Sequence, residues 1–173
     1  MNDTIEIREE RDSDVDAIRA VHDAAFGREH EGRLVDRLRS DGLLAASVVG
    51  LVDGCVVGNA VFSGLLLRSN GGSLNAVALA PLAVLPASQR RGIGSRLVRA
   101  GLDLCAAQRY VAAFVLGDPA YYSRFGFSAT AAKNVRSKYA GAGDAWMALE
   151  FRPATLSGRQ LKAIYPDAFG IVD

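Results

Sequence analysis

Cysteine is scarce in this chain, and long apolar runs are missing from it. Its 173 residues include only Cys55 and Cys105, which are too few for a disulfide framework. No stretch of 18 or more residues is apolar and uncharged, so we expect no membrane-spanning helix. Residues 1–6 lack the basic start and apolar run of a secretory signal peptide. These features together predict a cytoplasmic protein, since free thiols are typical of a reducing compartment.

An excess of charge of one sign is also missing. The formal net charge is +1, which gives no general attraction to nucleic acid, and we expect no nucleic-acid partner. We expect no metal site either. Half of the residues are apolar, as in a folded rather than a disordered chain. The length predicts one domain that spans residues 1–173.

A glycine-containing loop before a helix is the most informative segment. Gln89-x-x-Gly92-x-Gly94 follows the apolar residues 82–84. Backbone N–H groups of residues 90–95, together with the first turn of the helix, make an anion site large enough for a pyrophosphate. Position 97 is Leu rather than the third glycine of the dinucleotide fingerprint, and no lysine lies near the loop, which excludes a P-loop.

Two motifs together resemble the GNAT superfamily of N-acetyltransferases. The loop Gln89-x-x-Gly92-x-Gly94 is similar to its acetyl-CoA loop. Residues 117–127 read Gly-Asp-Pro-Ala-Tyr-Tyr-Ser-Arg-Phe-Gly-Phe and place Tyr122 four residues before Gly126, as GNAT enzymes place a tyrosine before a Gly-Phe pair. This variant resembles a bacterial subgroup of uncharacterised GNAT proteins. The resemblance covers residues 5–151 in motif and in the order of elements.

The expected elements include a hairpin block followed by one βαβ crossover, which predicts a mixed sheet. The GNAT resemblance implies an α/β (α+β) fold in which this sheet is mostly antiparallel and has flanking helices. Strands are expected at 4–8, 44–52, 55–62, 74–85, 110–116 and 146–151, with a weak strand within 128–144. Three longer helices are expected, with inward faces at Val15, Ile18, Val21 and Phe26, at Leu34, Val35 and Leu38, and at Leu97, Val98, Gly101, Leu102 and Cys105. Two short helices are also expected, one that ends at Gly126 and one near Leu161. The GNAT resemblance implies that the central parallel strands splay apart.

Pro81 lies inside one of the expected central strands. A proline cannot donate a hydrogen bond to a neighbouring strand, so it indicates a bulge or an unpaired edge. We expect a bulge, which is common beside active sites, although Pro81 could instead precede a short strand that begins at Leu82.

The resemblance also implies roles for particular residues in an acetyl-CoA-dependent N-acetyltransferase. The expected cofactor contacts are Leu82, Ala83, Val84, Gln89, Arg90, Arg91, Gly92, Ile93, Gly94 and Ser95. The Leu82 N–H would polarise the thioester carbonyl, and Val84 would bond the pantetheine arm. Side chains of Arg90, Arg91, Arg96 and Arg99 either help with the phosphates or form a solvated basic face. Tyr122 is the expected general acid, and Tyr121 is expected to be a packing residue.

Other parts of the mechanism stay open at this level. The attacking amine must lose a proton, for which Glu31, Asp118, His22, His30 and water are candidates. Residues 117–119 stand where many GNAT enzymes have a cofactor-binding Asn, so we expect no such contact. The acceptor is a small-molecule or peptide amine, and the protein is a monomer or a homodimer. Direct attack in a ternary complex is favoured, because no cysteine is placed to carry an acyl group. A non-catalytic acyl-CoA sensor and an acyltransferase for a longer acyl group are the alternatives.

Overall fold

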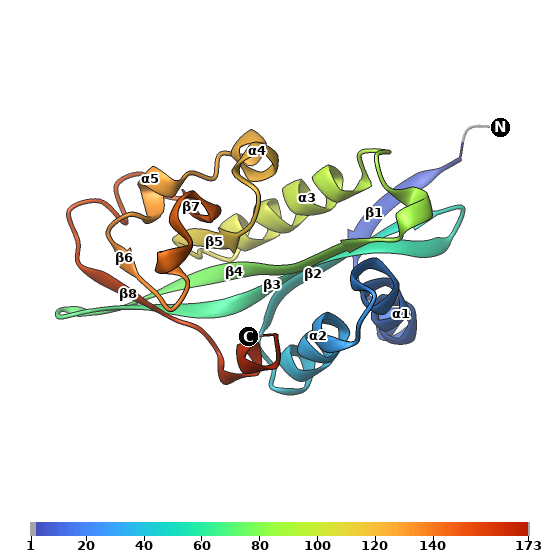
Figure 1. The fold of residues 1–173 in the computed structure, drawn as a ribbon, viewed down its shortest axis with the longest axis horizontal. Coiled ribbons are helices and arrows are strands. Elements are labelled where there is room, and N and C mark those ends of the chain that lie inside the picture. The colour runs from blue at the N-terminus through green and yellow to red at the C-terminus, as the bar shows by residue number, and fades with distance from the viewer. Residues whose placement is uncertain (1–2, 173) are drawn as a thin grey trace.

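The fold is one twisted eight-stranded sheet with helices on both of its faces (Figure 1). The computed structural model describes residues 3–172, so both ends of the expected 1–173 domain lie outside the described residues. The main strands lie in the order β1-β2-β3-β4-β5-β7, with bounds β1 Ile5–Glu9, β2 Leu44–Val52, β3 Cys55–Ser69, β4 Gly72–Val84, β5 Ala112–Leu116 and β7 Trp146–Glu150. In this series β4–β5 is the one parallel pair. The predicted mixed, mostly antiparallel sheet is confirmed.

The sheet separates two apolar clusters, and helices cover one cluster on each face. The described helices are α1 (Val15–Phe26), α2 (His30–Ser40), α3 (Ile93–Ala107), α4 (Pro119–Tyr122) and α5 (Ala129–Ala132), with 3₁₀ turns at Asp12–Asp14, Pro86–Ser88, Ser123–Phe125, Ala140–Ala145 and Asp167–Ile171. Ile18 and Leu34 bring α1 and α2 into one cluster with Phe169 near the C-terminus. Leu97 and Val98 bring α3 into the other. No helix within residues 3–172 is long and apolar enough to cross a membrane.

The C-terminal segment corrects one prediction. The expected short helix near Leu161 is strand β8 (Leu161–Ile164), which pairs with β3 and with the short strand β6 (Val135–Arg136). The helix prediction was wrong because β3 runs on to Ser69, well beyond the predicted end at Phe62, and so offers β8 an edge to join. The weak strand predicted within 128–144 is confirmed as β6.

Strands β4 and β5 touch only briefly and then part. Their register holds two pairs, Val77 with Ala113 and Ala78 with Phe114. Beyond Ala78, β4 continues to Val84 along β3 alone. In the β3–β4 register Ala60 faces Leu82 but Phe62 faces Leu79, so β4 carries one extra residue at Ala80–Pro81. The predicted bulge at Pro81 is therefore confirmed, and it lies where the two parallel strands separate.

Helix α3 rests directly on the sheet at Gly101. A Cβ atom at this glycine would lie 2.0 Å from Cε2 of Phe62, and the Phe62 side chain in β3 is fully buried. The missing side chain therefore sets how closely α3 approaches β3. Since the glycine loop leads into α3, the same contact fixes the height of that loop above the sheet.

We predict that Gly101→Ala lowers the free energy of unfolding by at least about 1 kcal/mol. Overpacking costs about 1–3 kcal/mol. A Cβ only 2.0 Å from a buried ring atom puts the cost at the upper end of this range, so it exceeds by about 1–2 kcal/mol the gain of up to about 1 kcal/mol that alanine brings to a helix. Chemical denaturation measures the change. Gly141→Ala is the matched control, because no atom lies within 4 Å of its Cβ position. A Gly101→Ala variant as stable as the parent would show that Phe62 gives way freely.

Candidate active site

The loop between β4 and α3 turns sharply through two residues of positive φ. Arg90 has φ 60° and Gly92 has φ 78°, and α3 begins at Ile93 immediately afterwards. Successive N–H groups in such a turn, followed by the first turn of a 15-residue helix, favour an anion. The Gln89 side chain donates from Nε2 to the carbonyl oxygen of Val84 at 3.0 Å, which ties the loop back to the end of β4.

The free edge of β4 exposes the backbone of alternate residues. Leu85 N–H donates to the carbonyl oxygen of Val57 in β3 at 2.8 Å. Residues of an antiparallel strand alternate between bonding the neighbour and facing away from it, so Ala83 also bonds β3, whereas Leu82 and Val84 face the other edge. Since β5 has already separated from β4, the backbone groups of Leu82 and Val84 lie on an edge without a neighbouring strand.

A cavity of about 490 Å³ lies against this loop, and we call it the loop cavity. It is lined by Leu82, Val84, Ser88, Gln89, Arg90, Gly92, Ile93, Gly94, Ser95, Tyr121 and Arg124. Eight of the ten predicted cofactor contacts are therefore brought together. The structure does not bring the other two to it: Ala83 is buried toward β3, and Arg91 pairs with Asp3 at 2.9 Å. Both charged residues in this lining, Arg90 and Arg124, are cations.

The arginines considered for phosphate binding separate into different places. Arg96 donates to the carbonyl oxygen of Ile5 at 3.3 Å, and the Arg99 guanidinium lies 5.3 Å from the ring centre of Phe125. Neither lines the loop cavity, whereas Arg90 does. Arg124 joins Arg90 there although sequence reasoning missed it. Its position between Tyr122 and Gly126, within the second motif, is the signal that could have found it.

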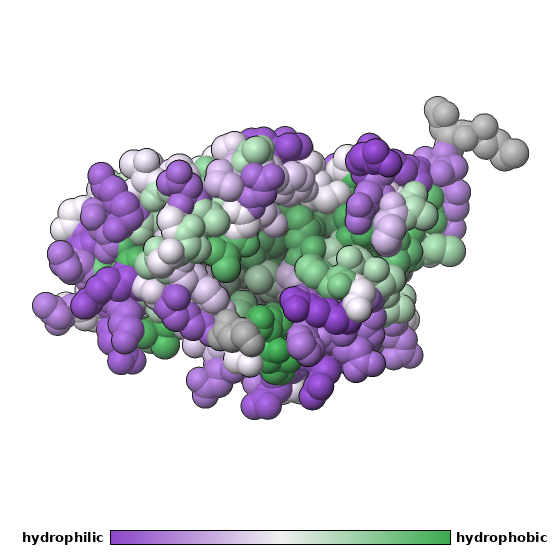
Figure 2. Space-filling model, in the orientation of Figure 1, coloured by the Kyte–Doolittle hydropathy of each residue, from purple (hydrophilic) through white to green (hydrophobic). Residues whose placement is uncertain are grey.

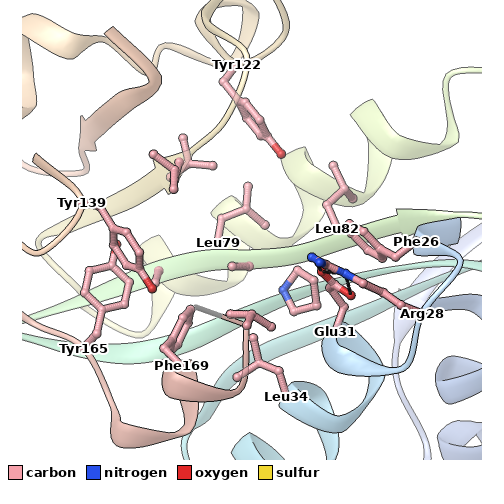
Figure 3. A pocket seen from close by; sticks show the side chains of 16 residues that line it. Phe26, Arg28, Glu31, Leu34, Leu79, Leu82, Tyr122, Tyr139, Tyr165 and Phe169 are labelled. Carbon is pink, nitrogen blue, oxygen red and sulfur yellow. Dashed lines mark hydrogen bonds and ion pairs between the residues drawn. The ribbon is translucent and has the colours of Figure 1, made fainter. Parts of the chain in front are cut away.

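A second cavity, of about 450 Å³, opens where β4 and β5 part, and we call it the gap cavity (Figure 3). Its lining is mostly apolar and aromatic and consists of Phe26, Arg28, Glu31, Leu34, Ala78, Leu79, Ala80, Pro81, Leu82, Val115, Leu116, Tyr122, Tyr139, Tyr165, Phe169 and Val172. Apolar residues also gather in the hollow at the centre of this face of the molecule (Figure 2). Leu82 lines both cavities, so the two adjoin at the bulge.

Tyr122 lines the gap cavity, and its hydroxyl group points into it (Figure 3). Gly117 makes room for the ring, because a Cβ there would lie 2.4 Å from Cε2 of Tyr122. Phe127 packs edge-on against the same ring with centroids 6.0 Å apart. Burial, with a smaller contribution from Tyr121, raises the pKa of Tyr122 to about 12. The phenol is therefore protonated at neutral pH and can donate a proton or a hydrogen bond.

Tyr121 faces the loop cavity, the opposite way from its neighbour. It has the ring contacts expected of a packing residue, with Tyr122 at 5.0 Å and Phe125 at 5.5 Å between centroids. Its hydroxyl oxygen, however, lies 2.9 Å from the position that a Cβ of Gly94 would take. Tyr121 therefore does more than pack against neighbouring rings, because its phenol group also reaches the glycine loop.

The proposed bases prove to be poor ones for different reasons. His22 is fully buried outside both cavities, where burial lowers its pKa and its Nε2 lies 2.9 Å from Oδ1 of Asn59. His30 is exposed on α2 and lines neither cavity. The Asp118 carboxylate caps α4 by accepting from Ala120 N–H at 2.8 Å.

Glu31 is the candidate base that does reach the gap cavity. Burial has the largest single effect and would raise its pKa. The hydrogen bonds and positive charge of Arg28, a backbone hydrogen bond and the nearby His30 together outweigh burial, so the pKa of Glu31 is lowered. Arg28 Nε lies 3.1 Å from each carboxylate oxygen, and Nη2 also bonds Oε1. A carboxylate held in this way is a weak proton acceptor. In residues 3–172 no group of three or more His, Cys, Asp or Glu side chains could hold a metal ion.

Comparisons with known proteins agree with this geometry. The family model described as acetyltransferase (GNAT) domain matches residues 6–130. The uncharacterized N-acetyltransferase YhbS of Escherichia coli (strain K12) is 36% identical over 153 residues, which cover 88% of this chain and 90% of YhbS.

Two crystal structures are similar along nearly the whole chain. The structure of E. coli YhbS in complex with CoA has a TM-score of 0.88 at 33% identity and covers 98% of this chain and 94% of its own. A GNAT family acetyltransferase from Brucella melitensis in complex with acetyl-CoA has a TM-score of 0.79 at 34% identity. The match covers 96% of this chain and 98% of the Brucella chain. On the family match and these likenesses, the chain belongs to the GNAT family of N-acetyltransferases.

Proposed function

We propose that this enzyme transfers an acetyl group from acetyl-CoA to a primary amine by direct attack in a ternary complex. The observation that carries the proposal is the meeting of the two cavities at Leu82, with Tyr121 facing one and Tyr122 facing the other. The loop cavity is suited to the cofactor and the gap cavity to the acceptor. The two similar crystal structures support the choice of cofactor, since one contains CoA and the other acetyl-CoA.

The loop cavity has the chemistry that a coenzyme A pyrophosphate requires. Arg90 and Arg124 supply positive charge, and the turn before α3 supplies N–H donors. At Gly92 a Cβ would meet no atom within 4 Å, so the glycine leaves open space for a ligand. The edge of β4 at Leu82 and Val84 can bond an extended amide chain as a neighbouring strand would.

The residues at the junction perform separate parts of the transfer. When bound, acetyl-CoA supplies a thioester whose sulfur can leave as a thiolate. The acceptor nitrogen forms the new bond to the carbonyl carbon while Leu82 N–H stabilises the negative charge on the carbonyl oxygen. Tyr122 gives its proton to the sulfur as the C–S bond breaks. The products are an N-acetyl amine and a free thiol, and the proton lost by the amine returns through water to the phenolate of Tyr122.

A covalent acyl-enzyme does not fit this site. Cys55 is exposed at the start of β3, and Cys105 is buried in α3 with its pKa raised to about 12 by burial. Neither cysteine lines either cavity.

Two free thiols also support a cytoplasmic location, because reducing compartments preserve them. We propose that residues 1–173 act as a single domain.

We predict that Gly94→Asp abolishes the thermal stabilisation of the protein by acetyl-CoA. The new carboxylate would extend toward Tyr121 and repel the phosphates. Acetyl-CoA at one hundred times its Kd should stabilise the parent by about 2.7 kcal/mol. Gly141→Asp adds the same charge away from both cavities and should respond like the parent. A Gly94→Asp variant that is still stabilised would contradict the cofactor assignment.

The adjacent tyrosines should have separable kinetic effects. We expect Tyr122→Phe to lower kcat by about 10- to 1000-fold with little change in the KM for acetyl-CoA, since one general acid is lost while the ring still packs. Tyr121→Phe should instead raise the KM for acetyl-CoA with kcat nearly unchanged. Initial rates of thiol release measure both. Equal activity of the two variants at saturation would exclude Tyr122 as the acid.

The pH profile tests whether the protein supplies a base. Because none of the proposed side chains suits the role, the rate should rise about tenfold per pH unit up to the pKa of the acceptor amine. The midpoint should therefore move with the acceptor when two amines of different pKa are compared. Tyr122 should cause no alkaline decline until pH approaches about 12. A midpoint that stays constant between acceptors would reveal a base on the enzyme.

A further inference from the structure

The gap cavity presents far more apolar than charged surface to an acceptor. Among residues 3–172, the charged residues that line it are Arg28 and Glu31, which already bond each other. The opposite wall is aromatic and comes from Tyr139, Tyr165 and Phe169 (Figure 3). Such a wall is suited to an aromatic or branched apolar group rather than to a polyamine or a sugar.

The mouth of the gap cavity is apolar as well. Within residues 3–172 the large hydrophobic side chains that remain exposed are Phe26, at 41%, and Leu116, at 46%. Both line this cavity. Phe26 lies at the end of α1, although the helical pattern predicted it on the buried face. Two large apolar groups in water at the entrance of one cavity indicate an apolar ligand that covers them.

Arg28 is held so that one edge of its guanidinium is left for a ligand. Glu31 takes the Nε side, with bonds from Nε and Nη2. No contact of Nη1 with Glu31 is among these bonds, and the Arg28 side chain is 54% exposed whereas that of Glu31 is 8% exposed. The buried carboxylate therefore orients the cation. An arginine held at its Nε edge can still bind a second carboxylate through its Nη atoms.

The cavity arranges these features in a line. In Figure 3 Arg28 lies at one end, the aromatic wall at the other, and Tyr122 points in from between them. The reacting amine must lie near Tyr122 and Leu82. A molecule that fills the cavity thus carries a carboxylate on one side of its amine and an apolar group on the other, which is the layout of an α-amino acid.

We propose that the acceptor is a free α-amino acid with a large apolar or aromatic side chain, whose carboxylate binds Arg28. This inference rests on the proposed acetyl transfer at Tyr122. Arg28 acts as the specificity residue for the carboxylate, and Glu31 is a positioning residue that acts through Arg28. The carbon that bears the amine lies between the two anchors, beneath the tyrosine hydroxyl.

The first test compares acceptors that differ in one group. With acetyl-CoA, kcat/KM for L-phenylalanine should exceed that for phenylalanine amide and for phenethylamine by about 10- to 100-fold, because both lack the carboxylate. It should exceed that for L-alanine by a similar factor of about 10- to 100-fold, because the methyl group leaves the aromatic wall uncovered. Equal or faster acetylation of phenethylamine would overturn the proposal while leaving the proposed acetyl transfer intact.

The second test removes the anchor. Arg28→Met should lower kcat/KM for L-phenylalanine by about 10- to 100-fold and leave phenethylamine within about threefold. Arg33→Met, on the exposed face of α2, is the matched control. Arg28→Lys keeps the charge near Glu31 if the methionine variant folds poorly, and it should show a smaller loss in the same direction. Equal losses for both acceptors would overturn the role of Arg28.

A binding measurement separates the two proposals. In the presence of CoA, N-acetyl-L-phenylalanine should raise the melting temperature of the parent and not that of Arg28→Met. N-acetylphenethylamine should raise the melting temperature of the parent less than N-acetyl-L-phenylalanine does. Product binding of this kind without any turnover would support the acceptor site and overturn the catalytic proposal. Turnover of other amines with no binding of N-acetyl-L-phenylalanine would overturn the acceptor site alone.

Discussion

The site depends on one strand that is bonded on a single side. After Ala78, β4 keeps its hydrogen bonds to β3 but has lost β5, and the extra residue at Pro81 falls in this stretch. A backbone edge without a neighbour would normally invite pairing with another chain. Here the edge faces two cavities instead. Because β5 no longer lies beside this part of β4, the loop cavity and the gap cavity adjoin there and Leu82 borders both.

The half of the site made by local backbone could be predicted from the sequence. Gly92 and Gly94 mark a turn before a helix wherever they occur in this pattern, and Pro81 excludes a regular ladder. Both features follow from the conformational limits of single residues. Most of the order of strands and helices along the chain followed in the same way, from apolar periodicity and short turns. Side-chain directions were less accessible, since Arg91, Arg96 and Arg99 all turn away from the loop cavity toward partners distant in the sequence.

The half made by distant side chains could not be predicted. Tyr139, Tyr165 and Phe169 belong to segments without clear periodicity, and they meet because β8 joins the extended end of β3. An expected helix near Leu161 would have placed them differently. Arg28 stands between two helices in no motif at all. Its place in the gap cavity depends on its bond to Glu31 and on the packing of α1 against α2, which are tertiary effects.

The two halves of the site differ in how they can change over evolutionary time. The loop side uses main-chain atoms, which survive most substitutions as long as the glycines remain. The gap side draws Tyr165, Phe169 and Val172 from the last residues of the chain that the structure describes. A few replacements among these residues would reshape one wall and leave the other side unaltered. Such a division allows selectivity to diverge among relatives while the donor stays the same.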